Sequence, residues 1–288
     1  MTMSSASIAI TPFARQHRQA VDDLLFNSYQ VHTHMDWFDP IDWLDRFPQL
    51  TRLAWHGDEL AGVLGVSAPF NGASWLRIAA VHDDAPPQTT LTALWDDLIP
   101  QLSDQSAQSV SLLMGRNWIK RFLLALDFRF VEDVVTMQRT NGHLPPPEDS
   151  TYRIRVAGQG DLHRMAAIDS MAFKPPWQMT LAEIRQAQRT AEFCTVAELD
   201  QQIVGFQIST LYRDGAHLAR LAVDPAYQRQ GIGSRLVQDI LRRFMRHQLM
   251  SITVNTQASN LRSQRLYHQF GFSRNGYDLP VWSFQLPR

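Results

Sequence analysis

The sequence predicts a mixed α/β protein made of two domains of similar size. Its 288 residues suffice for two ordinary domains, and 44% hydrophobic and 10% aromatic residues suffice for packed cores. Short apolar runs that alternate like strands are interleaved with amphipathic runs of helical spacing. Three consecutive prolines within 140–151 favour an extended spacer near the middle of the chain. The expected domains are therefore 1–139 and 152–288, joined by a proline-rich linker.

In the second half, strand and helix patterns alternate. Asp161 can cap a helix that places Met165, Ile168 and Met171 on one face. The loop AFKPPWQM, 172–179, separates this helix from the next one. The expected strands are 152–157, 193–199, 203–213, 216–223, 251–256 and 282–286, and further helices are expected from 181, from 233 to Met245 and over 259–270.

The first half repeats this order. Val81 in SWLRIAAV corresponds to Val223 in HLARLAV, and Phe128 in RFLLALDF corresponds to Phe272 in RLYHQFGF. The offsets of 142 and 144 residues fit a long-period internal duplication. The expected strands are 8–10, 52–56, 60–67 and 74–81, and the expected helices lie around 21–25, 91–102 and 121–128. His32 and His34 fall between these elements and are expected to be solvated loop residues.

Charge is distributed unevenly along the chain, although the net charge is only −1. Residues 1–139 hold 10 Arg plus Lys against 16 Asp plus Glu, whereas 213–288 hold 11 Arg against 4 Asp. The basic final third is consistent with a site for a polyanionic ligand there. Neither nucleic acid nor an anionic membrane is expected as a partner, because no recognisable basic–aromatic motif is present.

Several other classes of protein are not indicated. The lone Cys194 excludes an internal disulfide and is expected to be a small buried hydrophobe. No Cys-x-x-Cys or His-Glu-x-x-His spacing occurs, so no metal is expected. No run of 18 apolar residues and no signal peptide is present, so a cytoplasmic monomer or homodimer is the expectation.

The stretch QRQGIG, 228–233, lies between the strand that ends at Val223 and the helix that starts near Gly233. A helix N-terminus offers unpaired N–H groups and a partial positive charge, and glycines let a ligand approach the backbone closely. Arg229 adds a cation, so a phosphate or pyrophosphate is the natural ligand. Taken alone, the hexapeptide can also be interpreted as an ordinary strand–helix turn that needs glycine for its geometry. No P-loop or dinucleotide-binding fingerprint fits these residues.

Four segments of the second half follow one another in a recognisable order: Leu-Ala-Val at 221–223, Q-x-x-G-x-G at 228–233, Ala-Ser-Asn at 258–260 and L-Y-x-x-x-G-F at 266–272. In these motifs and their order the chain resembles the Gcn5-related N-acetyltransferase family. The resemblance clearly covers 152–286 and more faintly 8–139. It implies two tandem acyl-CoA N-acyltransferase-like domains, each with a mostly antiparallel central sheet flanked by helices, and one intact site in the second.

The resemblance implies acetyl-CoA as co-substrate, lying between the strands that end at Val223 and begin at Ser251. The pantetheine arm would pair with the backbone of this first strand and contact Asn260. The Val223 N–H would polarise the thioester carbonyl. The implied contacts are Leu221, Ala222 and Val223 along the strand, and Arg229, Gln230, Gly231, Ile232, Gly233 and Ser234 around the pyrophosphate.

The resemblance also implies a general acid and leaves the base open. Tyr267 matches the family's acid, which donates a proton to the departing thiolate. Some relatives place a glutamate where this chain has Asn255, so His217 is the expected base. Alternation would place His217 on the same face as Leu221 and Val223. A water or an acidic residue such as Asp169 or Glu183 is the alternative.

The equivalent loop of the first half, HDDAPPQTT, lacks glycine and carries two carboxylates and two prolines, which would repel a pyrophosphate. Leu123 stands where Tyr267 stands in the second half. No acetyl-CoA is therefore expected in the first domain, which would be degenerate and serve as a scaffold or as one wall of the acceptor pocket.

The family's acceptor site implies Phe173, Pro176 and Trp177 together with Tyr277 and Trp282. The first three resemble the A-F-x-x-P-W stretch of acetyltransferases that modify ribosomal-protein N-termini. The expected function is direct transfer of acetyl from acetyl-CoA to a primary amine of a small molecule. The alternatives are a protein N-terminal acetyltransferase and a non-catalytic acyl-CoA-binding module.

Overall fold

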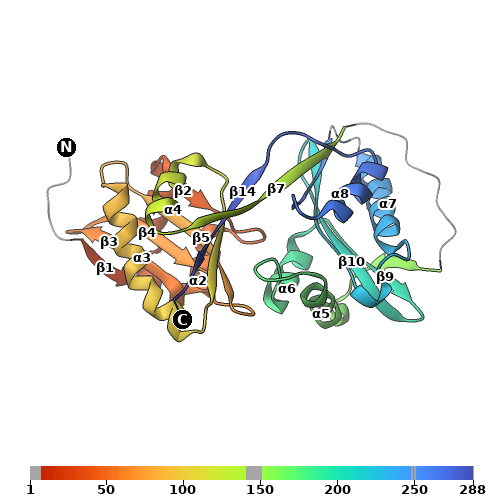
Figure 1. Cartoon of the computed structure of the whole chain (residues 1–288), viewed down its shortest axis with the longest axis horizontal. Helices are drawn as coiled ribbons and strands as arrows, with labels where there is room; N and C mark the ends of the chain where they lie inside the picture. Colours follow the sequence, from red (N-terminus) through yellow and green to blue (C-terminus); the bar gives the residue numbers. More distant parts are fainter. Residues whose placement is uncertain (1–7, 141–150, 248, 250, 288) are drawn as a thin grey trace. The chain divides into compact units, whose positions relative to one another are not determined.

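The computed structural model describes residues 8–140, 151–247, 249 and 251–287, and its chain forms two compact units (Figure 1). The first unit comprises Met1–Glu132 and Pro280–Arg288, and the second comprises Asp133–Leu279. These boundaries differ from the expected 1–139 and 152–288, because the last residues belong to the first unit. The expected linker falls almost entirely on 141–150, which lie outside the described residues.

The first unit has a sheet in the order β1-β3-β4-β5-β6-β14, with β2 paired to β5. Its β5–β6 pair is parallel, whereas β1–β3, β3–β4, β4–β5 and β6–β14 are antiparallel. The strands are β1 Ala9–Pro12, β2 Gln30–Thr33, β3 Thr51–His56, β4 Glu59–Val66, β5 Ala73–Val81, β6 Ser109–Leu113 and β14 Leu279–Gln285, and the helices are α1 Arg18–Asn27, α2 Pro40–Arg46, α3 Pro87–Asp104 and α4 Lys120–Ala125.

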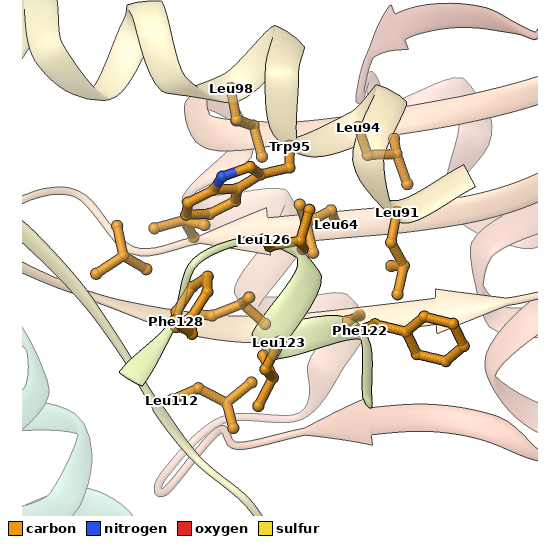
Figure 2. Close-up of a cluster of buried hydrophobic side chains, with 14 of the residues drawn as sticks. Leu64, Leu91, Leu94, Trp95, Leu98, Leu112, Phe122, Leu123, Leu126 and Phe128 are labelled. Carbon is orange, nitrogen blue, oxygen red and sulfur yellow. The ribbon is translucent and has the colours of Figure 1, made fainter. Parts of the chain in front are cut away.

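Helices cover both faces of this sheet, so successive strand residues are buried on opposite sides. Leu64 packs into the core under α3 and α4, while its neighbour Val63 packs into the core under α1 and α2. Figure 2 shows the α3–α4 core, where Trp95 and Phe128 lie close together. Their ring centroids are 5.1 Å apart. The buried leucine-rich faces explain why helical spacing identified both helices.

The second unit has a sheet in the order β7-β12-β11-β10-β9-β8, with β13 paired to β7. Its β11–β12 pair is parallel, whereas β8–β9, β9–β10, β10–β11 and β7–β12 are antiparallel. Figure 1 shows α5 and α6 on one side of this sheet and α7 and α8 on the other. The elements are β7 Arg129–Arg139, β8 Arg153–Val156, β9 Phe193–Leu199, β10 Gln202–Leu211, β11 Gly215–Val223, β12 Ser251–Gln257, β13 Ser273–Arg274, α5 Leu162–Ala172, α6 Leu181–Thr190, α7 Ile232–Phe244 and α8 Leu261–Gln269.

The mixed α/β prediction is confirmed, but two strands complete the sheets in an unexpected way. β14 pairs with β6, from Val281 opposite Leu113 to Gln285 opposite Ser109. β7 continues out of the first unit and pairs with β12, from Arg139 opposite Ile252 to Val134 opposite Gln257. β7 and β14 thus each pair with a strand from the other half of the chain. Sequence patterns could not reveal this pairing, because two duplicated sheets offer equivalent edges to the same strand.

Some local expectations were wrong. Asp161 makes no side-chain cap for α5, because its carboxylate accepts from Arg155 and the Gly158 N–H. Met171 is exposed, because the buried face of α5 continues to Asp169 instead, and Met245 is exposed just beyond the end of α7. His32 lies on β2 and is 3% exposed rather than solvated. Among the described residues, none of the helices has the length and hydropathy needed to cross a membrane.

Candidate active site

A β-bulge opens one edge of β11. Ile208 pairs with Arg220 and the next residue, Ser209, pairs with Leu218, so Ala219 is the extra residue. The parallel ladder between β11 and β12 ends at the same place, with Leu218 opposite Val254. The two strands therefore diverge from Ala219 onward, as the family resemblance implied for strands that hold acetyl-CoA.

The Val223 N–H points toward this open edge. The Asp224 N–H donates in the other direction, to the Val204 carbonyl at 2.9 Å. Because successive N–H groups of a strand point to opposite sides, the Val223 N–H faces away from β10. The Gln228 side chain donates to the Val223 carbonyl at 3.1 Å, so the loop that follows β11 folds back along the same edge.

The loop then leads into the N-terminus of α7. Arg229 has φ +67 and Gly231 has φ +84, and a left-handed conformation at a residue such as Arg229 often marks a functional site. Gly231 is the N-cap residue, so α7 has no side-chain cap at this position. A Cβ built on Gly231 has no atom within 4 Å. Open space, an uncapped helix end and a nearby guanidinium fit a pyrophosphate.

The other expected cofactor residues are placed as follows. The Ile232 side chain is buried in the core, so only its backbone can reach a ligand. Gln230 accepts from the Tyr152 hydroxyl at 3.3 Å. Asn260 is the N-cap of α8, where its Oδ1 accepts from the Ser263 N–H at 3.1 Å. This cap leaves the Nδ2 donor of Asn260 available to a ligand.

Tyr267 lies on α8 in a core with Leu218 and Val254, the last pair of the parallel ladder. It is 4% exposed. Burial raises the pKa of Tyr267 well above its ordinary value, while the nearby charge of Arg220 acts in the opposite direction. The phenol therefore keeps its proton at neutral pH, as a general acid must.

His217 does not share a face with Leu221 and Val223. The bulge at Ala219 shifts the alternation, and Leu221 and Val223 pack toward α7 with Ile232. Burial lowers the pKa of His217 from 6.5 to about 4, so its imidazole is neutral at physiological pH.

The hydrogen bonds of His217 allow it to present a lone pair at Nε2. Its Nδ1 lies 2.8 Å from the Thr253 hydroxyl, which also lies 3.3 Å from the Ala216 carbonyl. When this hydroxyl donates to Ala216, Thr253 accepts from Nδ1–H, and the lone pair of His217 is then on Nε2.

The alternative bases are engaged elsewhere. Asp169 is 0% exposed and accepts two hydrogen bonds from Arg220. Glu183 closes a capping box at the start of α6, where it accepts from the Thr180 N–H at 2.8 Å. Asn255 is exposed on β12 and carries no proton-accepting group of useful basicity. His217 is thus the neutral imidazole of this set, and its lowered pKa makes it a weak base.

The structure brings two of the expected acceptor residues together and separates a third. The Arg220 guanidinium lies 3.6 Å from the centroid of the Phe173 ring and donates to the Trp177 carbonyl at 2.6 Å. Tyr277 is 76% exposed in the loop before β14. The assignment of Trp282 to the acceptor pocket was wrong, because it is 6% exposed within the α3–α4 core of the first unit.

In the first unit, a strand fills the equivalent of the open edge. The bulge residue here is Arg77, and the parallel β5–β6 ladder ends at Trp75 opposite Ser111. Beyond the bulge, β2 pairs with β5 from Thr33 opposite Ile78 to Gln30 opposite Val81. The edge that corresponds to Arg220–Val223 is thus occupied by the protein's own backbone.

Sequence reasoning missed the role of Arg220. An arginine inside the otherwise apolar run HLARLAV and an aspartate on the apolar face of α5 both needed buried partners, and that need was the available signal. The strand β2 was also missed, because a four-residue segment with one apolar residue and one histidine carries little strand pattern.

Comparisons with known proteins point to one family of enzymes. The model of the acetyltransferase (GNAT) family matches residues 162–272. The [ribosomal protein bS18]-alanine N-acetyltransferase of Escherichia coli K12 is 30% identical over 115 residues, which are 39% of this chain and 75% of that enzyme. The chain belongs to the GNAT family. The enzyme of the same name from Haemophilus ducreyi is 28% identical over 133 residues, 44% of this chain and 90% of that protein.

Over almost its whole length, the chain also resembles a solved structure of a tandem GNAT protein. A tandem GNAT protein from the clavulanic acid biosynthesis pathway superposes with a TM-score of 0.66 and 13% identity, covering 98% of this chain and 99% of that one. This likeness supports the fold of two tandem GNAT-like units. The family match and the curated relatives identify the chain as an N-acetyltransferase, an enzyme of a family that uses acetyl-CoA. Among the described residues, no cluster of three or more His, Cys, Asp or Glu could hold a metal ion.

Proposed function

We propose that this enzyme transfers acetyl from acetyl-CoA to the α-amino group at the N-terminus of a protein or peptide, at one site in the second unit. The observation that carries the proposal is that the open edge of β11 is followed in the chain, after one loop, by the uncapped N-terminus of α7. A strand edge can pair with the amide groups of pantetheine, and the helix end can hold the pyrophosphate.

The residues around this path can perform the transfer. Acetyl-CoA, when bound, supplies the acetyl group as a thioester that an amine attacks directly. The Val223 N–H would stabilise negative charge on the carbonyl oxygen. Tyr267 would give its phenolic proton to the departing sulfur, and Nε2 of His217 would accept the proton that the amine loses.

The first unit is proposed to bind no acetyl-CoA. Its β2 strand already uses the hydrogen-bonding groups of β5 from Ile78 to Val81. Its α3 begins at Pro87, which has no N–H to offer a phosphate. At the position that corresponds to Tyr267 it has Leu123, whose side chain has no proton to donate. One acetyl-CoA per chain is therefore expected.

The weak base favours an acceptor that is already partly deprotonated. An α-amino group has a pKa of about 7.7–8.0, so roughly 30% of it is neutral at pH 7.5. An alkyl amine such as a lysine side chain, with a pKa of about 10.4, is only about 0.1% neutral at the same pH. A site whose candidate base is His217, with a pKa of about 4, suits the first kind of amine.

The relatives point the same way, since the two described above are named as alanine N-acetyltransferases of a ribosomal protein. Their names support a protein amine more directly than the small-molecule amine that the sequence analysis favoured. The loop with Phe173 and Trp177, held beside β11, is the proposed wall of the acceptor site.

Two measurements test this function. Calorimetric titration with acetyl-CoA should give one site per chain, and two sites would contradict the degenerate first unit. Acetyl transfer should then be compared among three acceptors: a short peptide with a free N-terminal alanine and an internal lysine, the same peptide with a blocked N-terminus, and a small primary amine. Transfer to the free peptide alone is expected. Equal transfer to both peptides would refute the preference for α-amines, and transfer only to small amines would restore the earlier hypothesis.

A further inference from the structure

One buried ion pair connects α5 to β11. The Nε of Arg220 donates to Oδ2 of Asp169 at 2.7 Å, and its Nη2 donates to Oδ1 at 2.9 Å. The Asp169 side chain is 0% exposed and that of Arg220 is 13% exposed. This bidentate geometry fixes the plane of the guanidinium as well as its position.

The same pair holds the loop between α5 and α6 at three points. The guanidinium lies over the Phe173 ring at 3.6 Å from its centroid and donates to the Trp177 carbonyl at 2.6 Å. Oδ1 of Asp169 also accepts from the Met179 N–H at 2.7 Å. The loop from 173 to 179 is therefore attached at its beginning, its middle and its end.

Arg220 occupies a particular place on β11. It follows the bulge residue Ala219 and is the first residue of the open edge. Its charge also acts on Tyr267, so the guanidinium lies within electrostatic reach of the proposed acid. One side chain thus links the acceptor loop, the strand that would hold the thioester and the general acid.

We propose that Arg220, held by Asp169, is a positioning residue that sets the acceptor loop against the open edge of β11, an inference that rests on the proposed function. The pair orients the amine toward the acetyl group by fixing Phe173 and Trp177. A purely structural role explains it less well, because a buried ion pair stabilises a fold little better than packed apolar residues. Arginine is required because lysine has neither the two-pronged donor geometry nor a planar face to stack.

The test compares Arg220→Lys and Arg220→Gln with Arg155→Gln. Arg155 is a matched control, because it bridges Asp161 and Glu198 at 2.6 Å each in the same unit, and its hydrogen bonds go to these two residues and to Val156, away from the loop. Hydrogen–deuterium exchange of the peptide that covers 173–179 should become faster in both Arg220 variants and stay unchanged in the control. Thermal melts show whether each variant is folded.

Kinetics with the alanine peptide supply the second readout. The KM for the peptide should rise roughly tenfold or more in both Arg220 variants, since small misplacements of a reactant are costly. The dissociation constant for CoA should stay within about twofold of wild type. The lysine variant keeps the charge, so a loss as large as that of the glutamine variant assigns the effect to geometry.

Three results would overturn the inference: unchanged exchange in Arg220→Gln, faster exchange with unchanged peptide kinetics, or an equal loss of CoA affinity. If the wild-type enzyme acetylates no amine, the proposed function fails. The exchange experiment then still decides separately whether Arg220 holds the loop.

Discussion

Replacing Gly231 with glutamate tests the proposed pyrophosphate site directly. Gly231 has φ +84, and a Cβ at this position meets no protein atom within 4 Å. The new side chain would therefore fit sterically and project from the loop that precedes α7. The left-handed backbone would cost about 1–2 kcal/mol of stability for any residue other than glycine.

The expected loss of affinity comes from charge. A carboxylate about 5 Å from one phosphate charge is repelled by about 3 kcal/mol at an effective dielectric constant of about 20. The second phosphate adds to this repulsion, and salt removes part of it. A net loss of about 3 kcal/mol in binding free energy raises the dissociation constant roughly 100-fold.

Calorimetric titration with CoA measures this change. Gly57→Glu is the matched control, because Gly57 has φ +60, has open space around its Cβ and lies in the β3–β4 turn of the first unit. It adds the same charge and a similar strain away from the loop. Both variants should melt at a lower temperature, and only Gly231→Glu should lose CoA binding. Wild-type affinity in Gly231→Glu would refute the pyrophosphate assignment.

Three further predictions concern titratable groups. Tyr267→Phe should lower kcat about 100-fold with CoA affinity retained, and a wild-type rate in steady-state assays would remove Tyr267 as the acid. His217→Ala should lower kcat about tenfold, by the same factor from pH 6 to 8, because the pKa of His217 is lowered to about 4 and the group stays neutral throughout. His32 has its pKa lowered from 6.5 to about 4 by burial, so its contribution to stability is full above pH 6.5 and is lost as the pH falls toward 4. The full loss, reached below pH 4, is about 3 kcal/mol, of which about 2 kcal/mol falls between pH 7.5 and 5. Urea unfolding at these two pH values should therefore show less acid destabilisation in His32→Asn than in wild type.

Much of this protein could be read from local sequence. Side-chain periodicity and turn residues are short-range properties, so the order of strands and helices, the duplication and the position of QRQGIG before α7 were all predictable. The family motif similarly indicated Tyr267 and Asn260, because both lie on one continuous segment with the glycine–phenylalanine end of α8.

Tertiary structure decided the features that depend on pairing between distant segments. β7 pairs with β12, β14 pairs with β6, and β2 pairs with the open edge of β5 in the first unit. In each case a strand selects one of several equivalent edges, and the alternation of apolar and polar residues along the strand does not distinguish them. The bulge at Ala219 reversed the side of β11 on which His217 was expected, because one inserted residue shifts the whole alternation. Asp169 and Arg220 lie 51 residues apart, and only folding shows that each neutralises the other and that Asp169 is not free to act as a base.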